Sequence, residues 1–256
     1  MFAVGGLNVG ALIGAAVSAA KVDKPLLSAI ERTYQVAQDR VETWSAKLFG
    51  AIPMGGTGGS RELTATEGKL LDQLTLDRGV VGLQRFKTIA GDAFSVADRR
   101  VPPSASMPPE VRRTLDDKPA DVRATAIEQW PRNDGHNDAF RHAFWNARLT
   151  AEFGENWTKQ FATAHEGSNI GNSTREAMDL YNNEVGRRVA TENPRATPEQ
   201  LADLVKQALD AGELVVIGRN GHLNWSDAVA NGRHGVSKQL GVADAIRVPA
   251  GDASAR

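Results

Sequence analysis

The sequence predicts a mainly α-helical protein with at most one or two short strands. Apolar residues recur at the three- and four-residue spacing of helices through most of the chain after residue 20. One short apolar run, residues 214–217, lies between glycines and fits a strand. With 41% hydrophobic and 24% charged residues, the 256-residue chain can build a packed core.

Two glycine- or proline-rich stretches suggest how the chain is divided. Residues 50–60 read as a flexible linker, and residues 101–109, with four prolines, read as a hinge. We therefore expect a helical segment at 1–50, a middle helical region at 51–105 and a bundle-like helical domain at 106–250.

The first 20 residues are apolar and close to the length of a membrane-spanning helix. Gly6, Gly10 and Gly14 recur on one helical face, the small-xxx-small spacing that lets helices approach closely. This predicts a glycine-zipper helix that contacts a membrane or is covered by a chaperone. Burial against its own protein is an alternative, and so is a cleaved signal peptide, although no Lys or Arg precedes the run.

The apolar spacing predicts a helix within residues 21–49 and two helices within 63–100. Thr64 and Glu67 have the spacing of a capping box at the start of the second region. Gly79 and Gly82 are expected to interrupt that region and separate its two helices.

A helix beginning near Asp138 carries the first group of reactive side chains. Asp138, His142 and Asn146 stand four residues apart, so they share one helical face, and Arg141 lies beside them. We expect Asp138 to cap this helix.

Two further helices are expected nearby, at 156–166 and 175–190. The first ends in His165 and Glu166, and the second carries a polar stripe that includes Asp179, Asn182 and Asn183. If the three helices surround one cleft, acids, imidazoles and amides meet there.

This set of side chains suits hydrolysis of an ester, phosphoester or amide bond, by one of two mechanisms. In the first, Asp138, His142, His165 and Asp179 bind zinc or another divalent metal, and Glu166 is the base. In the second, no metal is needed, because His142 and His165 form an acid–base pair and Arg141 stabilises a developing anion. The expected catalytic residues are Arg141, His142, His165 and Glu166, and the expected substrate-binding residues are His136, Asn146, Asn182 and Asn183.

Each of these residues taken alone also fits a purely structural role, and only the density of the set favours function. Of the other histidines, His222 lies in a loop that is a candidate to complete the pocket, and His234 is expected to be exposed. The absence of cysteine excludes disulfides, thiolate metal sites and a cysteine nucleophile. A formal net charge of −1 gives no strong nucleic-acid signal.

Three sequence blocks carry a resemblance to a known family. Residues 138–146 read D-A-F-R-H-A-F-W-N, residues 164–166 read A-H-E, and residues 178–187 read M-D-L-Y-N-N-E-V-G-R. These blocks resemble bacterial domains of unassigned function found in predicted secreted toxins and effectors. The resemblance covers about 60 residues, and the apolar N-terminus is similar to glycine-zipper segments of type VI secretion effectors.

The resemblance implies an antibacterial toxin that is secreted and delivered into a target cell, its periplasm or its membrane. It also implies a cognate immunity protein and a secretion chaperone or secretion-apparatus tip protein as partners. In the alternative, residues 1–20 insert into a membrane and form a pore, and the C-terminal cluster is structural. A third possibility is a non-toxic binding module.

Overall fold

The computed structural model describes residues 24–48, 52–53, 60–103, 107–168 and 173–237. Its helices are α1 (Leu27–Thr33), α2 (Ala65–Arg100), α3 (Pro109–Arg112), α4 (Ala120–Gln129), α5 (His136–Phe153), α6 (Glu155–Glu166), α7 (Ser173–Glu192) and α8 (Pro198–Asp210). The mainly helical fold predicted from the sequence is confirmed. The glycine-zipper prediction for residues 1–20 lies outside the described residues.

Three small antiparallel hairpins accompany the helices. They pair β1 (Val41–Trp44) with β4 (Arg61–Thr64), β2 (Lys47–Leu48) with β3 (Ile52–Pro53), and β5 (Val215–Ile217) with β6 (Leu223–Trp225). The C-terminal region thus has the two short strands that the sequence allowed. Because the first two hairpins lie in the N-terminal part of the chain, the described residues hold more strands than we predicted.

The expected helix at 21–49 is therefore wrong over most of its length. Only Leu27–Thr33 is helical, and Val41 to Trp44 pair with the strand that ends at Thr64. Trp44 is buried and donates from its indole nitrogen to Asp72 on α2, 2.9 Å away. Packing against α2 thus fixes a strand where the apolar spacing alone suggested a helix.

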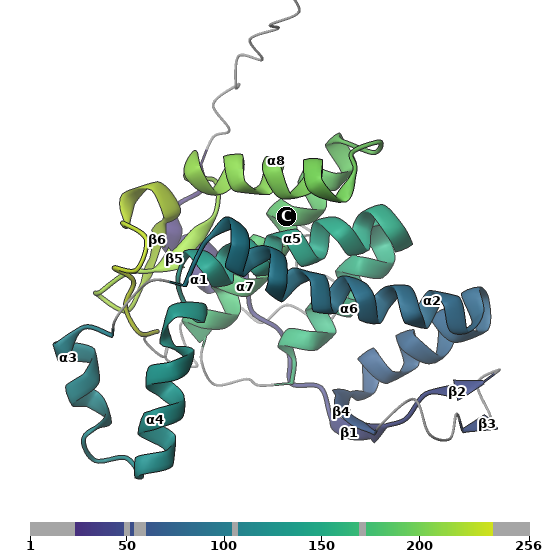
Figure 1. The fold of residues 1–256 in the computed structure, drawn as a ribbon, viewed down its shortest axis with the longest axis horizontal. Helices are drawn as coiled ribbons and strands as arrows, with labels where there is room; N and C mark the ends of the chain where they lie inside the picture. The colour runs from purple at the N-terminus through teal and green to yellow at the C-terminus, as the bar shows by residue number, and fades with distance from the viewer. Residues whose placement is uncertain (1–23, 49–51, 54–59, 104–106, 169–172, 238–256) are drawn as a thin grey trace, which may run out of the picture.

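Helix α5 is the centre of the molecule (Figure 1) and packs against α2, α6, α7 and α8. Its buried face is made of small and aromatic residues that have no more than 1% exposure, namely Ala139, Phe140, Ala143, Phe144 and Ala147. The alanines let neighbouring helices approach, and the phenylalanines fill the space between them. Burial of the whole α5 face holds the polar residues of that helix in fixed positions.

Helix α2 covers one side of α5 and α6, and it bends at Gly79, where φ is +63°. The predicted interruption is confirmed at Gly79 but is wrong at Gly82, which is helical, and the capping box of Thr64 and Glu67 is confirmed. Leu83, Phe86 and Ile89 of α2 join Phe161 of α6 in one apolar cluster. The middle region therefore packs onto the C-terminal helices, and the boundaries 1–50, 51–105 and 106–250 stay a prediction.

Helices α3 and α4 project to one side of the body (Figure 1), and neither has a buried residue. Within the part of the chain that the structure describes, none of the helices has the length and apolarity needed to cross a membrane.

Helices α5 and α7 meet most closely at Gly186. A Cβ atom there would lie 2.0 Å from the carbonyl oxygen of Ala143, so only glycine allows this approach. Glycine inside a helix costs about 1 kcal/mol relative to alanine, and close packing explains its presence here.

We expect Gly186→Ala to lower the free energy of unfolding by about 1–3 kcal/mol, because the added methyl group must push α5 away from α7. Gly91→Ala is the matched control: Gly91 is also helical, and nothing lies within 4 Å of a Cβ atom there. This control is expected to raise the free energy of unfolding by roughly 0.4–1 kcal/mol. Urea denaturation measures both, and equal effects would contradict the packing argument.

Candidate functional site

The site begins at the tight turn that precedes α5. Asp134 has a positive φ of 62°, a conformation that Asp tolerates better than most residues. Its carboxylate accepts two hydrogen bonds from Arg175 on α7, of 2.6 and 2.7 Å, and its backbone N–H donates to Asp138 at 2.7 Å. Asp138 is therefore the third residue of α5 rather than its cap, and Gly135 occupies the cap position.

Asp138, His142 and Asp179 form the centre of the site. One oxygen or nitrogen atom from each lies within 4.8 Å of the other two. His142 Nε2 is 3.5 Å from Asp138 Oδ1 and 3.6 Å from Asp179 Oδ1. Because α5 supplies two of these residues and α7 the third, the close contact of the two helices at Gly186 brings them together.

Negative charge is concentrated around this centre. The carboxyl groups of Asp134, Asp138, Glu166 and Asp179 are accompanied by the guanidinium groups of Arg141 and Arg175. Burial and the neighbouring Glu166 and Asp138 raise the pKa of Asp179 well above its ordinary value. Asp179 Oδ1 is also buried without a hydrogen-bond partner. The site thus contains an acceptor that needs a proton or a cation.

Arg141 partly meets this need. Its guanidinium contacts Asp138 and lies 3.5 Å from His142 Nε2. Burial raises the pKa of Asp138, but Arg141 and His142 outweigh this effect and the net shift is downward. Burial also lowers the pKa of His142, against the charges of Asp138 and Glu166, so the imidazole is neutral near pH 7. A guanidinium can only donate, so its contact assigns the lone pair of His142 to Nε2.

A chain of amide groups leads away from the other ring nitrogen of His142. His142 Nδ1 faces Glu166 Oε1 at 3.7 Å, and Asn183 donates to the same oxygen at 3.3 Å. Asn146 donates to Asn183 at 2.5 Å and accepts from Arg187 at 3.2 Å. Both asparagines are fully buried. The chain therefore fixes Glu166 behind His142 and orients the imidazole.

His165 takes a different partner from the one expected. Its Nδ1 lies 2.9 Å from Glu67 Oε1 on α2, while Glu67 Oε2 accepts from the backbone N–H of Thr64 in the capping box. Burial lowers the pKa of His165, but the hydrogen bond to Glu67 and the charge of Glu166 outweigh it and raise the pKa to about 9. His165 is therefore positively charged at neutral pH.

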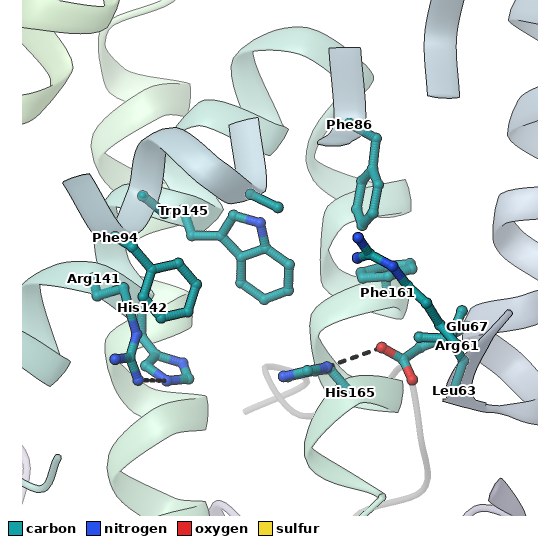
Figure 2. Close-up of a pocket in the computed structure, with 12 residues that line it drawn as sticks. Arg61, Leu63, Glu67, Phe86, Phe94, Arg141, His142, Trp145, Phe161 and His165 are labelled. Carbon is teal, nitrogen blue, oxygen red and sulfur yellow. Dashed lines mark hydrogen bonds and ion pairs between the residues drawn. The ribbon is translucent and has the colours of Figure 1, made fainter. Parts of the chain in front are cut away.

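His142 and His165 line one pocket of about 220 Å³. Figure 2 shows Arg141 and His142 on one side, Glu67 and Arg61 on the other, and the second ring nitrogen of His165 directed away from Glu67. Most of the remaining wall is apolar and is made of Leu63, Phe86, Ala90, Ala93, Phe94, Trp145 and Phe161. The pocket thus combines the neutral imidazole of His142 and the charged imidazole of His165 with an apolar lining.

Several predicted roles need correction. His165 is outside the group of candidate metal ligands, because its Nδ1 is held by Glu67. Asn146 and Asn183 bind other side chains rather than face the pocket. Asn182 forms two 2.9 Å hydrogen bonds with the backbone of Val215 and holds β5 against α7.

Two other histidines are also structural. His136 Nε2 lies 2.9 Å from the carbonyl oxygen of Ser226, and His136 is not among the residues that line the pocket of His142 and His165. The expectation that His234 is exposed is wrong, because this residue is only 1% exposed. Its ring stacks on Trp130, and its Nε2 lies 3.1 Å from the Trp130 carbonyl oxygen. Half-buried His222 pairs with Glu31 of α1 and is not among the residues that line the pocket.

Three residues important to the site were not identified from the sequence. Asp134 was not singled out from the sequence, and Arg175 was only the first residue of an expected helix. Glu67 was identified only as part of a capping box. Its second role had no sequence signal, because the partner His165 is 98 residues away along the chain.

A family model described as a domain of unknown function, DUF6973, matches residues 117–213. The match includes the whole of α4, α5, α6, α7 and α8, and with them Asp138, His142, Glu166 and Asp179. No curated protein and no solved structure matches the chain.

The charged pair of His165 and Glu67 leads to a pH prediction. The folded chain holds the His165 proton more tightly than the unfolded chain, so protonation of His165 adds to the free energy of unfolding. This stabilisation is complete below about pH 6.5 and is lost as the pH rises through about 9. The side chain is 48% exposed, so we expect a small slope.

An NMR titration of His165 is expected to give a midpoint near 9 in the native chain. Glu67→Gln should move that midpoint downward, because the side chain keeps its capping hydrogen bond but loses its charge. A midpoint unchanged by this substitution would contradict the pairing.

Proposed function

We propose that the chain is a divalent-metal-dependent hydrolase of ester or phosphoester bonds, and that Asp138, His142 and Asp179 hold the metal. The observation that carries the proposal is the distance of His142 Nε2 from the two carboxylate oxygens, 3.5 and 3.6 Å. Ligand bonds of about 2.1 Å in a tetrahedral site separate ligand atoms by about 3.4 Å. Zinc or another divalent ion fits such a set of one nitrogen and two oxygens.

The unpartnered oxygen of Asp179 supports the same assignment. A carboxyl group with a strongly raised pKa and a buried free acceptor gains most from a nearby cation. Glu166 supports the role of His142 as a ligand, because a carboxylate behind the second ring nitrogen raises the basicity of the first. We therefore assign Glu166 to positioning rather than to the base role that the sequence suggested.

Arg141 must turn away from Nε2 when a metal binds. Its guanidinium already lies 4.9 Å from the ring centre of Phe94, at the pocket wall, so a short movement keeps it beside the substrate. In that position Arg141 stabilises negative charge that develops on the substrate. In this proposal Arg141 neutralises the carboxylates when no metal is bound and the substrate when the metal is bound.

The remaining groups suit the departure of an alcohol. The oxygen of water bonds to the phosphorus or carbonyl carbon and water releases a proton to solvent, while the bond to the alcohol oxygen breaks and that oxygen takes a proton. His165 is charged at neutral pH and directs its second ring nitrogen away from Glu67, so it is the proton donor in this proposal. A bound divalent ion would polarise the bond under attack and favour ionisation of water.

The antibacterial role belongs to the proposal as well. Its support is that the three sequence blocks that resemble secreted bacterial toxins supply Asp138, His142, Glu166 and Asp179. We accordingly propose a secreted toxin with a cognate immunity protein and a secretion chaperone or tip protein.

Asp179→Asn is expected to weaken binding of Zn²⁺ or Mn²⁺ by at least the ~10–100-fold typical of losing an outer-shell partner, since Asp179 is a direct ligand. Isothermal titration calorimetry and elemental analysis of the purified chain measure this. Asp121→Asn, an exposed change on α4, is the control and should bind metal as the native chain does. A native chain that binds neither metal would refute the metal site.

Arg141→Gln is expected to bind metal at least as tightly as the native chain, because a competing positive charge is removed. Its hydrolysis of bis(4-nitrophenyl) phosphate should nevertheless fall by about 10²–10³-fold, the usual loss for one donor to a developing oxyanion. If metal affinity and hydrolysis fall together, Arg141 supports the ligands rather than the substrate.

A further inference from the structure

The wall of the pocket is mainly supplied by residues outside the family match. Phe86, Ala90 and Phe94 come from α2, and Arg61 and Leu63 come from β4. The matched helices supply the imidazoles, together with Trp145 and Phe161. The reactive groups and most of the apolar wall thus belong to different parts of the chain, and the wall is the part that can select a substrate.

The apolar part of the pocket has a definite size. Its volume is about 220 Å³. An apolar cavity of about 150 Å³ accommodates benzene, and sites for drug-sized ligands begin at about 300 Å³. Phe86 and Trp157 flank Phe161 with their ring centres 4.9 and 5.1 Å from its own, so the aromatic wall is well packed. The space suits one aromatic ring or a short acyl chain.

Positive charge borders the same space. Arg61 lines the pocket, and it forms no ion pair with any residue that the structure describes. Its side chain extends toward the aromatic wall (Figure 2). His165 adds a second positive charge, and Arg141 a third, whereas Glu67, the partner of His165, is the one acidic residue among the described residues that line the pocket. An anionic group is therefore favoured next to the apolar space.

We propose that the substrate is an anionic ester, most simply a phosphoester, whose apolar part is about the size of one aromatic ring and packs against Phe86, Phe94, Trp145 and Phe161. Arg61 and His165 hold its negative charge. The assignment of the ligand as an ester substrate rests on the proposed hydrolase function. The preference of the pocket for an apolar anion can be measured without any reaction.

The test uses ligands that cannot be hydrolysed. Phenylphosphonate has both a ring and a charge, methylphosphonate lacks the ring, and benzyl alcohol lacks the charge. Calorimetric titrations of the full chain in EDTA isolate the pocket from any metal. Phenylphosphonate should bind at least about 10-fold more tightly than methylphosphonate, because losing even one methylene from an apolar pocket costs about that much.

Substitutions then locate the two contacts. Ala90→Trp fills the pocket and should abolish the preference for phenylphosphonate, while Thr88→Trp, an exposed change two residues away on α2, should keep it. Phe94→Ala, at a side chain that is 57% exposed, is a milder second variant and should reduce the preference. Arg61→Gln should weaken both phosphonates and leave benzyl alcohol unchanged, and circular dichroism checks the fold of every variant.

The results separate the two proposals. Equal affinity for the two phosphonates, or a preference that survives in folded Ala90→Trp and Phe94→Ala, overturns the substrate inference even if metal binding and hydrolysis are found. A ring preference that the α2 substitutions abolish supports the pocket's preference for an apolar anion even if the chain binds no metal and hydrolyses nothing. That outcome would overturn the proposed function and, with it, the assignment of the ligand as an ester substrate.

Discussion

The contact between α5 and α7 at Ala143 and Gly186 brings together the three residues at the centre of the site. The missing side chain of Gly186 lets the two backbones approach, and Asp138 and His142 thereby meet Asp179. The same approach places Asn146 opposite Asn183. A buried cluster of carboxyl groups, guanidinium groups and amides is costly to assemble, and the tight packing of the two helices holds it together.

The cluster is also ordered by distance from the pocket. His142 is the residue common to both, since it lines the pocket and contacts Asp138 and Asp179. Behind it, Glu166, Asn183 and Asn146 are linked to one another by hydrogen bonds. Such an arrangement separates the groups that can touch a ligand from those that hold them in place.

Sequence reasoning succeeded where the signal was local. The helical spacing of Asp138 and His142, the capping box at Thr64 and the break at Gly79 depend on residues a few positions apart, and the structure agrees. It failed where a role depends on a distant partner. A polar stripe such as Asn182 and Asn183 looks the same whether it faces a ligand, a strand or another amide.

The carboxylate of Glu67 has two roles. One oxygen accepts the capping hydrogen bond at the start of α2, and the other pairs with the charged ring of His165. Substitutions other than glutamine at this position therefore alter both the start of a 36-residue helix and the ionisation of a histidine in the pocket. Of the alternatives, glutamine alone keeps the helix start while removing the charge. Few substitutions at Glu67 can therefore change the pH dependence of this protein without also disturbing the start of α2.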